Sequence, residues 1–198
     1  MWEGLAARLE GRLVVLEPLE PRHEEELWEA ARDPEVWRWM TADAGAGRAD
    51  FHAWVEEAIA QARAGTRLPF AVLAAGDSRP IGSSSYLSLR PEHRGLEIGY
   101  TWMARTTWGT GANVEAKLLL MEHAFERLGC MRVEFKTEAR NERARAALAA
   151  LPARFEGVFR RHMLVRDGEV RDSAYYAVTD DEWPDVKAAL SGRVAARS

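Results

Sequence analysis

The sequence predicts a single domain with a mixed α/β fold, an inference that rests on three observations. A chain of 198 residues can bury one full hydrophobic core, and no repeat, low-complexity stretch or linker divides it. Segments that alternate apolar and polar residues, as strands do, lie between segments with helical spacing. Short turn-rich connections predict antiparallel strand pairs, whereas strand–helix–strand connections predict parallel ones, so the sheet should be mixed. The expected order is β-α-α-β-β-β-α-β-α-β-β-α.

The first third of the chain is predicted to hold one strand and two helices. Residues 12–16 form a short apolar strand, and Pro21 then opens a helix whose first turns are acidic. A second helix is expected over residues 51–65, where apolar side chains recur at helical spacing. The aromatic segment 35–40 lies between these helices.

The middle of the chain is predicted to form a hairpin and then a strand that leads into a helix. Strands at 68–74 and 81–89 are joined by a linker rich in turn-forming residues. A third strand, 96–103, continues through a hinge into a helix that Gly129 ends. The apolar face of that helix comprises Val114, Leu118, Met121, Phe125 and Leu128.

The last third is predicted to complete the sheet and end in a helix. The expected elements are a strand at 131–136, a helix at 141–151, strands at 154–165 and 170–177, and a helix that follows a capping box at 179–182 and runs through Leu190. Asp167-Gly168 is typical of a hairpin turn between the two strands. The domain core should therefore span about residues 12–190 of the domain 1–198, with a frayed tail at 191–198.

The main functional signal is the turn Trp108-Gly109-Thr110-Gly111-Ala112-Asn113, between a strand and a helix N-terminus. The first N–H groups of a helix lack intrahelical partners, and the helix dipole adds positive charge there, so this turn favours an anion such as a phosphate. The dinucleotide fingerprint would need glycine where Val114 stands, and a Walker A loop would need lysine after Gly111. A linker without a ligand is the alternative.

This turn resembles the pyrophosphate loop of the GNAT superfamily of acyl-CoA N-acyltransferases, whose pattern is Gln/Arg-x-x-Gly-x-Gly/Ala. Trp108 at the first position of this pattern resembles the sequences of the RimJ/RimL-like branch of the superfamily. The predicted element order is also that of the GNAT fold. Further local similarities to this branch are Glu97-Ile98-Gly99-Tyr100, Asn141-x-x-Ala144, Glu156-Gly157, Asp167-Gly168, Asp172 and Glu182-Trp183.

The resemblance implies an acetyl-CoA-dependent N-acetyltransferase that acts on a primary amine, either a small molecule or a protein N-terminus. The amine would attack the thioester directly in a ternary complex, with acetyl-CoA as co-substrate and no metal. The residues expected to bind acetyl-CoA are Trp102, Met103, Arg105, Trp108, Gly109, Thr110, Gly111, Ala112, Asn113, Asn141 and Arg145. Trp37 and Trp39 are the candidates for an acceptor wall, with a place in the core as the alternative.

Two glutamates are candidates for the base that such a reaction needs. An alkyl amine with a pKa of about 10 is mostly protonated at pH 7, so a base or a water chain should assist. Glu97, on the central strand, is one candidate, and Glu156 is the other, by its position in the RimJ/RimL-like pattern. Either carboxylate could instead pair with an arginine. Relatives present Ser or Tyr to the departing thiolate, where this chain has Ala144 and Leu148. Tyr175, Tyr176 or water are the substitutes.

Composition argues against several other classes of function. The net charge of −4 disfavours nucleic-acid binding, and a single cysteine allows no internal disulfide. No His-Glu-x-x-His pair occurs, and no apolar run reaches membrane-spanning length. We therefore expect no nucleic acid, no membrane and no metal, a cytoplasmic location, and an acyl-CoA and an amine as partners; a homodimer is compatible with the sequence.

Two alternative functions remain open at this point. The first is a GNAT-fold protein that binds acyl-CoA as a sensor or partner and catalyses weakly, which the missing Ser/Tyr acid favours. The second is an RNA-associated protein, suggested by the cluster Arg160-Arg161-His162. Acidic residues interleave with every basic cluster, which argues against the second alternative.

Overall fold

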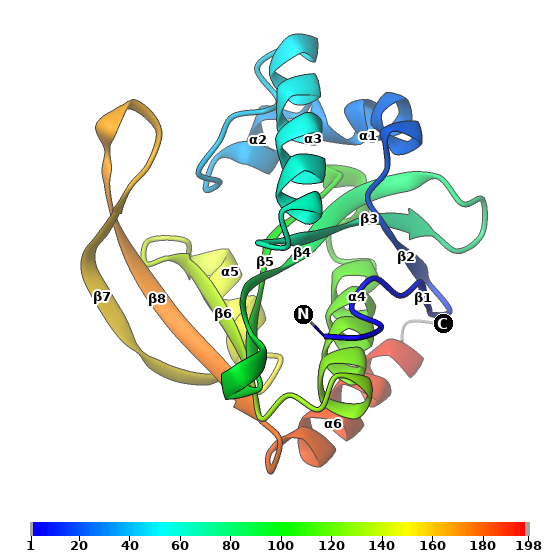
Figure 1. Ribbon diagram of the computed structural model, residues 1–198, viewed down its shortest axis with the longest axis vertical. Helices are drawn as coiled ribbons and strands as arrows, with labels where there is room; N and C mark the ends of the chain where they lie inside the picture. Colours follow the sequence, from blue (N-terminus) through cyan, green and yellow to red (C-terminus); the bar gives the residue numbers. More distant parts are fainter. Residues whose placement is uncertain (1, 197–198) are drawn as a thin grey trace.

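One eight-stranded sheet organises the computed structural model, which describes residues 2–196 (Figure 1). The strands are β1 (Leu9–Glu10), β2 (Val14–Pro18), β3 (Leu68–Ala74), β4 (Pro80–Arg90), β5 (Gly95–Met103), β6 (Arg132–Glu138), β7 (Arg154–Leu164) and β8 (Val170–Thr179). Their order in the sheet is β1-β2-β3-β4-β5-β6-β8-β7. The β5–β6 pair is parallel and the other pairs are antiparallel, so the predicted mixed α/β fold is confirmed.

Helices cover both faces of this sheet and create two hydrophobic cores. The helices are α1 (Glu24–Ala31), α2 (Pro34–Trp37), α3 (Arg48–Arg63), α4 (Ala112–Glu122), α5 (Glu142–Ala149) and α6 (Trp183–Ala195). The larger core lies between the sheet and helices α4, α5 and α6. The smaller core lies under α1, α2 and α3, and it is rich in tryptophan.

Several elements differ from the sequence-based prediction. The two-residue strand β1 and the one-turn helix α2 were not predicted; Asp33 caps α2 by accepting a hydrogen bond from the N–H of Glu35 (3.0 Å). Helix α6 continues to Ala195 with Val194 buried in the larger core, so the tail predicted to fray from residue 191 is helical to that point. The rest of that predicted tail includes residues 197–198, which lie outside the described residues.

Helix α4 ends earlier than predicted and continues as one π-helical turn, His123–Arg127. The Tyr86 hydroxyl donates a hydrogen bond to the Leu120 carbonyl (2.7 Å) and also contacts Nδ1 of His123 (3.1 Å). A side chain that takes a helix carbonyl disturbs the regular ladder, which is one way a π-turn forms. The predicted apolar face is retained, since Met121, Phe125 and Leu128 are buried.

A buried carboxylate fixes the N-terminal strands to α4. Glu115 accepts hydrogen bonds from the N–H groups of Arg12 (3.0 Å), Leu13 (2.6 Å) and Val14 (2.8 Å). Three N–H donors replace the water that a carboxylate loses on burial, so this glutamate stabilises the turn between β1 and β2.

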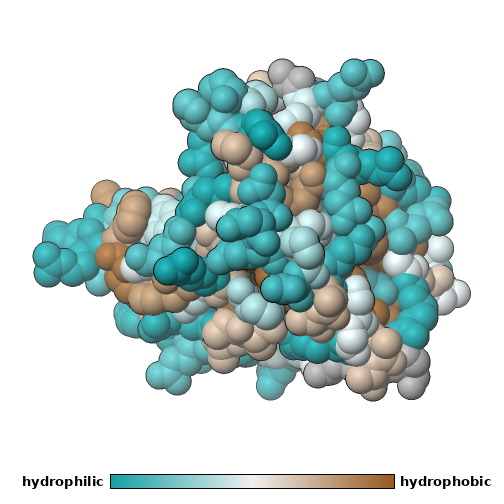
Figure 2. Space-filling model, turned by 90° about the horizontal axis from the view of Figure 1, so that it is seen from below, coloured by the Kyte–Doolittle hydropathy of each residue, from teal (hydrophilic) through white to brown (hydrophobic). Residues whose placement is uncertain are grey.

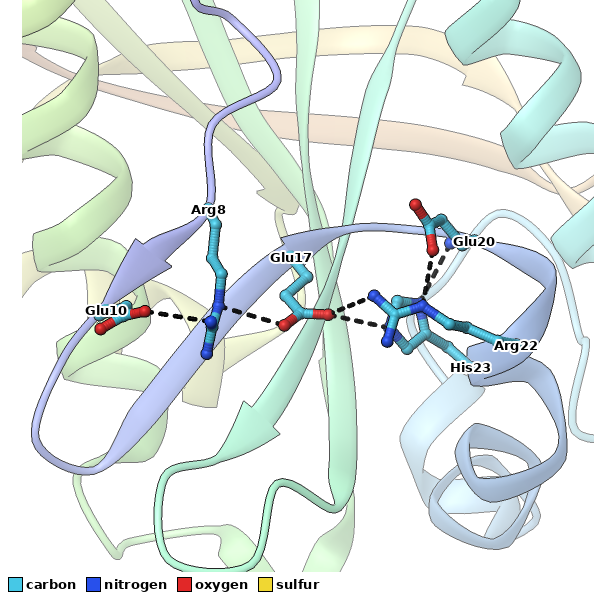
Figure 3. Close-up of polar contacts among 6 residues, drawn as sticks. All are labelled: Arg8, Glu10, Glu17, Glu20, Arg22 and His23. Atoms are coloured by element: carbon cyan, nitrogen blue, oxygen red, sulfur yellow. Dashed lines mark hydrogen bonds and ion pairs between the residues drawn. The ribbon is translucent and has the colours of Figure 1, made fainter.

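A second polar network joins the same strands to the start of α1 (Figure 3). Its members are Arg8, Glu10, Glu17, Glu20, Arg22 and His23. Burial opposes ionisation of Glu17, but hydrogen bonds from Arg22 and His23 hold the pKa of this carboxyl below its usual value. Burial lowers the pKa of His23. Because each of these side chains has a partner within the network, we assign it a structural role.

Strand β7 forms one edge of the sheet and carries exposed apolar side chains. Phe155, Val158, Phe159 and Leu164 are the main contributors, each at least 40% exposed. Apolar surface is visible on the side of the molecule where β7 lies (Figure 2). An exposed apolar edge strand is a typical site of association between chains.

Candidate functional site

A cavity of about 430 Å³ opens where the two parallel strands of the sheet separate. Strands β5 and β6 are paired only from Gly95–Arg132 to Glu97–Glu134. Beyond Glu97, β5 continues to Met103 without a partner on that side. The backbone of its last six residues therefore faces a gap instead of a neighbouring strand.

A bulge in β5 helps to open this gap. The register with β4 shifts between Ser83–Trp102 and Ser85–Gly99, and Tyr100 in the bulge has a φ of 47°. A bulge bends its strand and increases the local twist, which turns β5 away from β6. The Tyr100 hydroxyl is hydrogen-bonded to Thr41 (2.9 Å), in the loop after α2.

The cavity has two halves that are built differently. We call the side formed by α4, α5 and the glycine turn the helix half; its lining residues are Trp108, Gly109, Gly111, Asn113, Lys117, Asn141 and Arg143. We call the opposite side, formed by the loop after α2 and by strands β5 to β8, the hairpin half; its lining residues are Trp39, Thr41, Glu97, Tyr100, Lys136, Met163 and Arg171.

The glycine turn shapes the mouth of the helix half. Gly109 and Gly111 have φ values of 82° and 102°, a region that other residues enter only with strain, and Gly111 is the N-cap of α4. The first hydrogen bond of the helix runs from the Glu115 N–H to the Gly111 carbonyl (3.0 Å). The N–H groups of residues 112–114 thus precede the helix's own ladder, at its positive end.

Two aromatic contacts hold this turn in place. The indole Nε1 of Trp108 donates to the Met103 carbonyl (3.0 Å), which ties the turn to the end of β5. The Arg143 guanidinium from α5 stacks on the Trp108 ring at 3.5 Å from its centroid. A positive charge therefore stands beside the helix N-terminus.

Asn113 and Lys117 face the cavity one helical turn apart on α4, each with a polar atom that forms no hydrogen bond with residues 2–196. Oδ1 of Asn113 is buried and accepts no hydrogen bond from residues 2–196. Lys117 is 8% exposed, and within the same residues its amine has no hydrogen bond or ion pair; it lies 5.3 Å from the centroid of the Phe135 ring. Burial lowers the pKa of Lys117 to about 8. An unpaired acceptor and an unpaired donor here favour a polar ligand.

The hairpin half carries the candidate base. Glu97 is 4% exposed, and its carboxylate contacts the Lys136 amine at 3.3 Å and the Ser88 hydroxyl at 3.4 Å. Arg166, at the tip of the β7–β8 hairpin, donates to Asp43 (2.8 Å) and to the carbonyls of Trp37 and Arg38 (3.2 Å each). These contacts fasten the hairpin to the loop after α2, both of which contribute lining residues to this half of the cavity.

The structure brings together part of the predicted site. Trp39, Glu97, Trp102, Met103, Trp108, Gly109, Gly111, Asn113 and Asn141 line the cavity. Asn141 also caps α5 by accepting from the Ala144 N–H (3.0 Å). The Trp102 side chain itself packs in the smaller core, 5.3 Å from the Trp37 ring.

Six predicted site residues do not line this cavity: Trp37, Arg105, Thr110, Ala112, Arg145 and Glu156. Trp37 is fully buried, and its indole N–H donates to the Ala31 carbonyl (2.6 Å). It is therefore a core residue, which was the alternative to a place in the acceptor wall. Arg105 is paired with Asp33 (3.7 Å), and Arg145 donates to the Tyr176 hydroxyl (3.2 Å). Both carboxylate oxygens of Glu156 bind the Arg132 guanidinium, the pairing that the sequence left open.

Sequence reasoning did not single out Lys117 or Arg171, and it named Tyr100 only as part of a family motif. It gave Thr41 only as the start of a substrate loop without a diagnostic motif. Arg143 was interpreted either as part of a solvated face or as a contact to the 3′-phosphate of CoA. Lys117 interrupts the apolar pattern of α4, which was an available signal. Thr41 and Arg171 reach the cavity only through contacts between distant segments, for which no local pattern exists.

No hydroxyl comes from α5 at the position where Ser or Tyr was expected. Ala144, Ala147 and Leu148 form that wall. The Tyr175 hydroxyl contacts Nε2 of His162 (3.2 Å), and neither Tyr175 nor Tyr176 lines the cavity. The two tyrosine substitutes considered from the sequence therefore stand away from it.

Two further features are absent from the described residues. Within residues 2–196, no helix combines the length and apolar character needed to cross a membrane. In that same part of the chain, His, Cys, Asp and Glu side chains form no group of three or more that could hold a metal ion.

Comparisons with known proteins agree on one family. The family model described as "Acetyltransferase (GNAT) domain" matches residues 13–153. A candidate acetyltransferase from T. thermophilus is 40% identical, covers 98% of this chain and 99% of its own, and has a TM-score of 0.88. A GCN5-related N-acetyltransferase from Brucella melitensis is 32% identical, with coverage of 96% and 86% and a TM-score of 0.89.

A more distant structure is Mycobacterium smegmatis RimJ in complex with CoA-disulfide. It is 24% identical, covers 98% of this chain and 97% of its own, and has a TM-score of 0.81. That likeness concerns the fold. No curated protein sequence matches the chain.

Proposed function

Because the chain belongs to the GNAT family of acetyltransferases, we propose that its cavity binds acetyl-CoA in the helix half and an amine in the hairpin half. The acetyl group would pass directly from the thioester to the amine. The observation that carries this proposal is the separation of β5 from β6 next to the glycine turn. One continuous cavity thereby joins an anion-binding turn, an unpaired strand backbone and a buried carboxylate.

The residues of the helix half fit the chemistry of acetyl-CoA. The N–H groups at the start of α4 would bind the pyrophosphate, with Arg143 adding positive charge at the mouth. The pantetheine arm carries amides, each of which has one donor and one acceptor. Oδ1 of Asn113 and the amine of Lys117 offer the complementary pair on one face of α4.

The proposed transfer needs one proton acceptor. The amine nitrogen would form a bond to the thioester carbonyl carbon, the C–S bond would break, and CoA would leave as a thiolate. Glu97 would accept the proton that the attacking amine releases, since its carboxylate lines the hairpin half. Water would protonate the thiolate, because the α5 wall of Ala144, Ala147 and Leu148 offers no hydroxyl.

A thermal-shift titration with acetyl-CoA tests the cofactor part of this proposal. A ligand present at 100 times its dissociation constant stabilises the folded state by about 2.7 kcal/mol. We expect saturable stabilisation by acetyl-CoA and none by adenosine, which lacks the pyrophosphate and the pantetheine arm. Equal stabilisation by both ligands, or by neither, would contradict the proposal.

Replacement of the candidate base tests the chemical part. Glu97→Gln should lower turnover by about 10²–10⁴-fold at pH 7, the range typical of a lost general base. The loss should be smaller at pH 9, where more of the amine is deprotonated in solution. Glu156→Gln is the matched control, because that carboxylate lies outside the cavity. A loss for Glu97→Gln that is equal at both pH values, or a larger loss for Glu156→Gln, would exclude Glu97 as the base.

The identity of the acceptor, the cytoplasmic location and a homodimer remain proposals. The name of one distant structural neighbour, a candidate ribosomal-protein-serine acetyltransferase from Vibrio cholerae, supports a protein as one acceptor class. The exposed apolar edge of β7 supports association of two chains.

The second candidate function is an acyl-CoA sensor with weak catalysis. The α5 wall, which offers no hydroxyl, favours this function. Stabilisation by acetyl-CoA without turnover of any amine would support it.

A further inference from the structure

We infer that the acceptor is a small amine bearing a carboxylate group, and that Arg171 binds this carboxylate. The inference rests on the proposed function, since it assigns the acceptor of the same cavity. Its basis is a buried guanidinium group that faces the hairpin half and has no hydrogen-bond or ion-pair partner among residues 2–196.

The position of Arg171 on β8 places it in the hairpin half. In the β6–β8 pairing, Lys136 lies opposite Tyr175 and Glu138 opposite Ser173. Alternate residues of a strand share a face, so Arg171 lies on the face that carries Tyr175. The opposite face carries Tyr176, whose hydroxyl contacts Arg145 of α5. Arg171 therefore faces away from α5, on the side where Lys136 contacts Glu97.

The guanidinium group of Arg171 is buried and unpaired. The residue is 7% exposed, and its Nε donates no hydrogen bond to any of the described residues. Across residues 2–196, none of its guanidinium nitrogens forms a hydrogen bond or an ion pair. Burial lowers the pKa of Arg171, but arginine stays protonated at any physiological pH. A buried charge without a partner is costly and is found where a ligand completes the site.

The nearby carboxylates already have other partners. Glu97 contacts Lys136 at 3.3 Å, and Glu138 contacts Arg140 at 3.1 Å. Among the charged residues named as lining the hairpin half, Glu97 and Lys136 offset each other and Arg171 leaves one positive charge. Glu138 and Glu97 act on Arg171 electrostatically but form no ion pair with it. A ligand that enters this half is therefore expected to bring one negative charge.

A second buried arginine, Arg67, has polar and aromatic partners, although its Nη2 is also buried without a hydrogen bond to residues 2–196. Nε of Arg67 donates to the Ser85 hydroxyl (2.9 Å), and its guanidinium stacks on the Tyr100 ring at 4.4 Å from the centroid. Arg67 does not line the cavity. Within residues 2–196, Arg171 has no such hydroxyl or ring and does line it, which distinguishes a ligand-binding arginine from a structural one.

A carboxylate is the anion that fits this arrangement best. The planar guanidinium fork binds a carboxylate through two parallel hydrogen bonds. The Arg166 contacts fasten the hairpin to the loop after α2 at this half, which favours a small molecule over a long polypeptide. With the carboxylate on Arg171, the amine of the acceptor would lie toward Glu97.

The test compares acids with their amides as acceptors. We would measure thiol release from acetyl-CoA with a panel of free α- and ω-amino acids and with the carboxamide of each. The wild-type protein should use at least one amino acid, with kcat/KM about tenfold or more above that of its amide, as expected for loss of a charge-assisted hydrogen bond. Turnover of amides equal to that of acids, or of neutral amines or peptide N-termini alone, would overturn the inference.

Substitutions test whether Arg171 causes the preference for acids over amides. Arg171→Gln should remove the acid-over-amide preference, and Arg171→Lys should restore part of it, because lysine keeps the charge but not the fork. Arg160→Gln, an exposed change on the same hairpin, should leave the preference intact. A preference that survives in Arg171→Gln would overturn the assignment. Acetyl-CoA should stabilise the wild-type protein and the three variants to the same extent. If acetyl-CoA stabilises none of them, the proposed function is wrong. If acetyl-CoA stabilises them but the wild type does not prefer acids to amides, only the inference about the acceptor is wrong.

Discussion

The two halves of the cavity are built from different parts of the chain, and the proposed function has them bind their ligands by different means. The helix half relies on main-chain features: the glycine turn, the start of α4 and the unpaired end of β5. The hairpin half relies on side chains, above all Glu97 and Arg171, supplied by strands that are far apart in sequence. From this difference we expect acetyl-CoA binding to be lost when the backbone of the helix half is disturbed, and acceptor binding to be lost when a single side chain of the hairpin half is changed.

The largest expected effect comes from disturbing the backbone of the helix half. Gly111 has a φ of 102°, so Gly111→Ala strains the turn and reorients the N–H groups after it. Loss of two hydrogen bonds to a charged phosphate corresponds to about 3–6 kcal/mol, or more than a hundredfold in the Kd for acetyl-CoA. Isothermal titration of acetyl-CoA measures this change.

Gly129→Ala is the matched control for backbone strain. Gly129 also has a positive φ, 66°, and an added Cβ would meet no atom within 4 Å. The variant should lose stability of the same order as Gly111→Ala but keep its affinity for acetyl-CoA. Equal affinity in both variants would show that the glycine turn does not bind the ligand.

This contrast also explains what the sequence could predict. The glycine turn is local, so the six residues from Trp108 to Asn113 suffice to predict an anion site. Strand alternation and turn residues likewise predicted the sheet, apart from the short strand β1. In the hairpin half, the family resemblance pointed to Glu97 and Trp39. Their meeting with Thr41 and Arg171 could not be predicted, because these residues come together only through pairing and loop contacts between distant segments. Trp37 and Trp39 show the same limit: two residues apart, one is core and the other lines the cavity.

The second-largest expected effect comes from a side chain of the helix half, Lys117, and it is an effect on stability. Lys117 has a pKa of about 8 in the folded protein, against 10.5 as its ordinary value. Between these two values the unfolded chain binds more protons than the folded one, so stability rises with pH in that window. Lys117→Met should therefore stabilise the ligand-free protein at pH 7, by on the order of 3 kcal/mol, with the gain shrinking from pH 8 to 10.5.

Thermal unfolding across this pH range measures the gain. The same variant should bind acetyl-CoA more weakly, since it loses the proposed contact with the pantetheine arm. Lys187→Met is the control, because Lys187 pairs with Glu122 (3.0 Å) and Glu126 (2.7 Å) and should give no gain. A Lys117→Met protein that is less stable than wild type at pH 7 would contradict this account.

The smallest effect comes from loosening the hairpin half without changing its lining. Arg166→Ala removes the contacts to Asp43 and to the loop carbonyls, at a cost of about 1 kcal/mol for a partly exposed group. The KM for the acceptor should rise a few-fold, while the Kd for acetyl-CoA should stay the same. Steady-state kinetics with both substrates varied separates the two constants. An unchanged acceptor KM, or a weaker acetyl-CoA affinity, would mean that the hairpin does not act on one half alone.

Hydrogen–deuterium exchange with and without acetyl-CoA tests the division of the cavity most directly. Exchange reports the protection of individual backbone N–H groups, which is the property that the helix half is proposed to use. Acetyl-CoA should slow exchange in residues 109–114 and 100–103, and leave the hairpin at 160–171 unchanged. Protection centred on the hairpin, with none in the glycine turn, would contradict the central claim that the backbone of the helix half holds the cofactor.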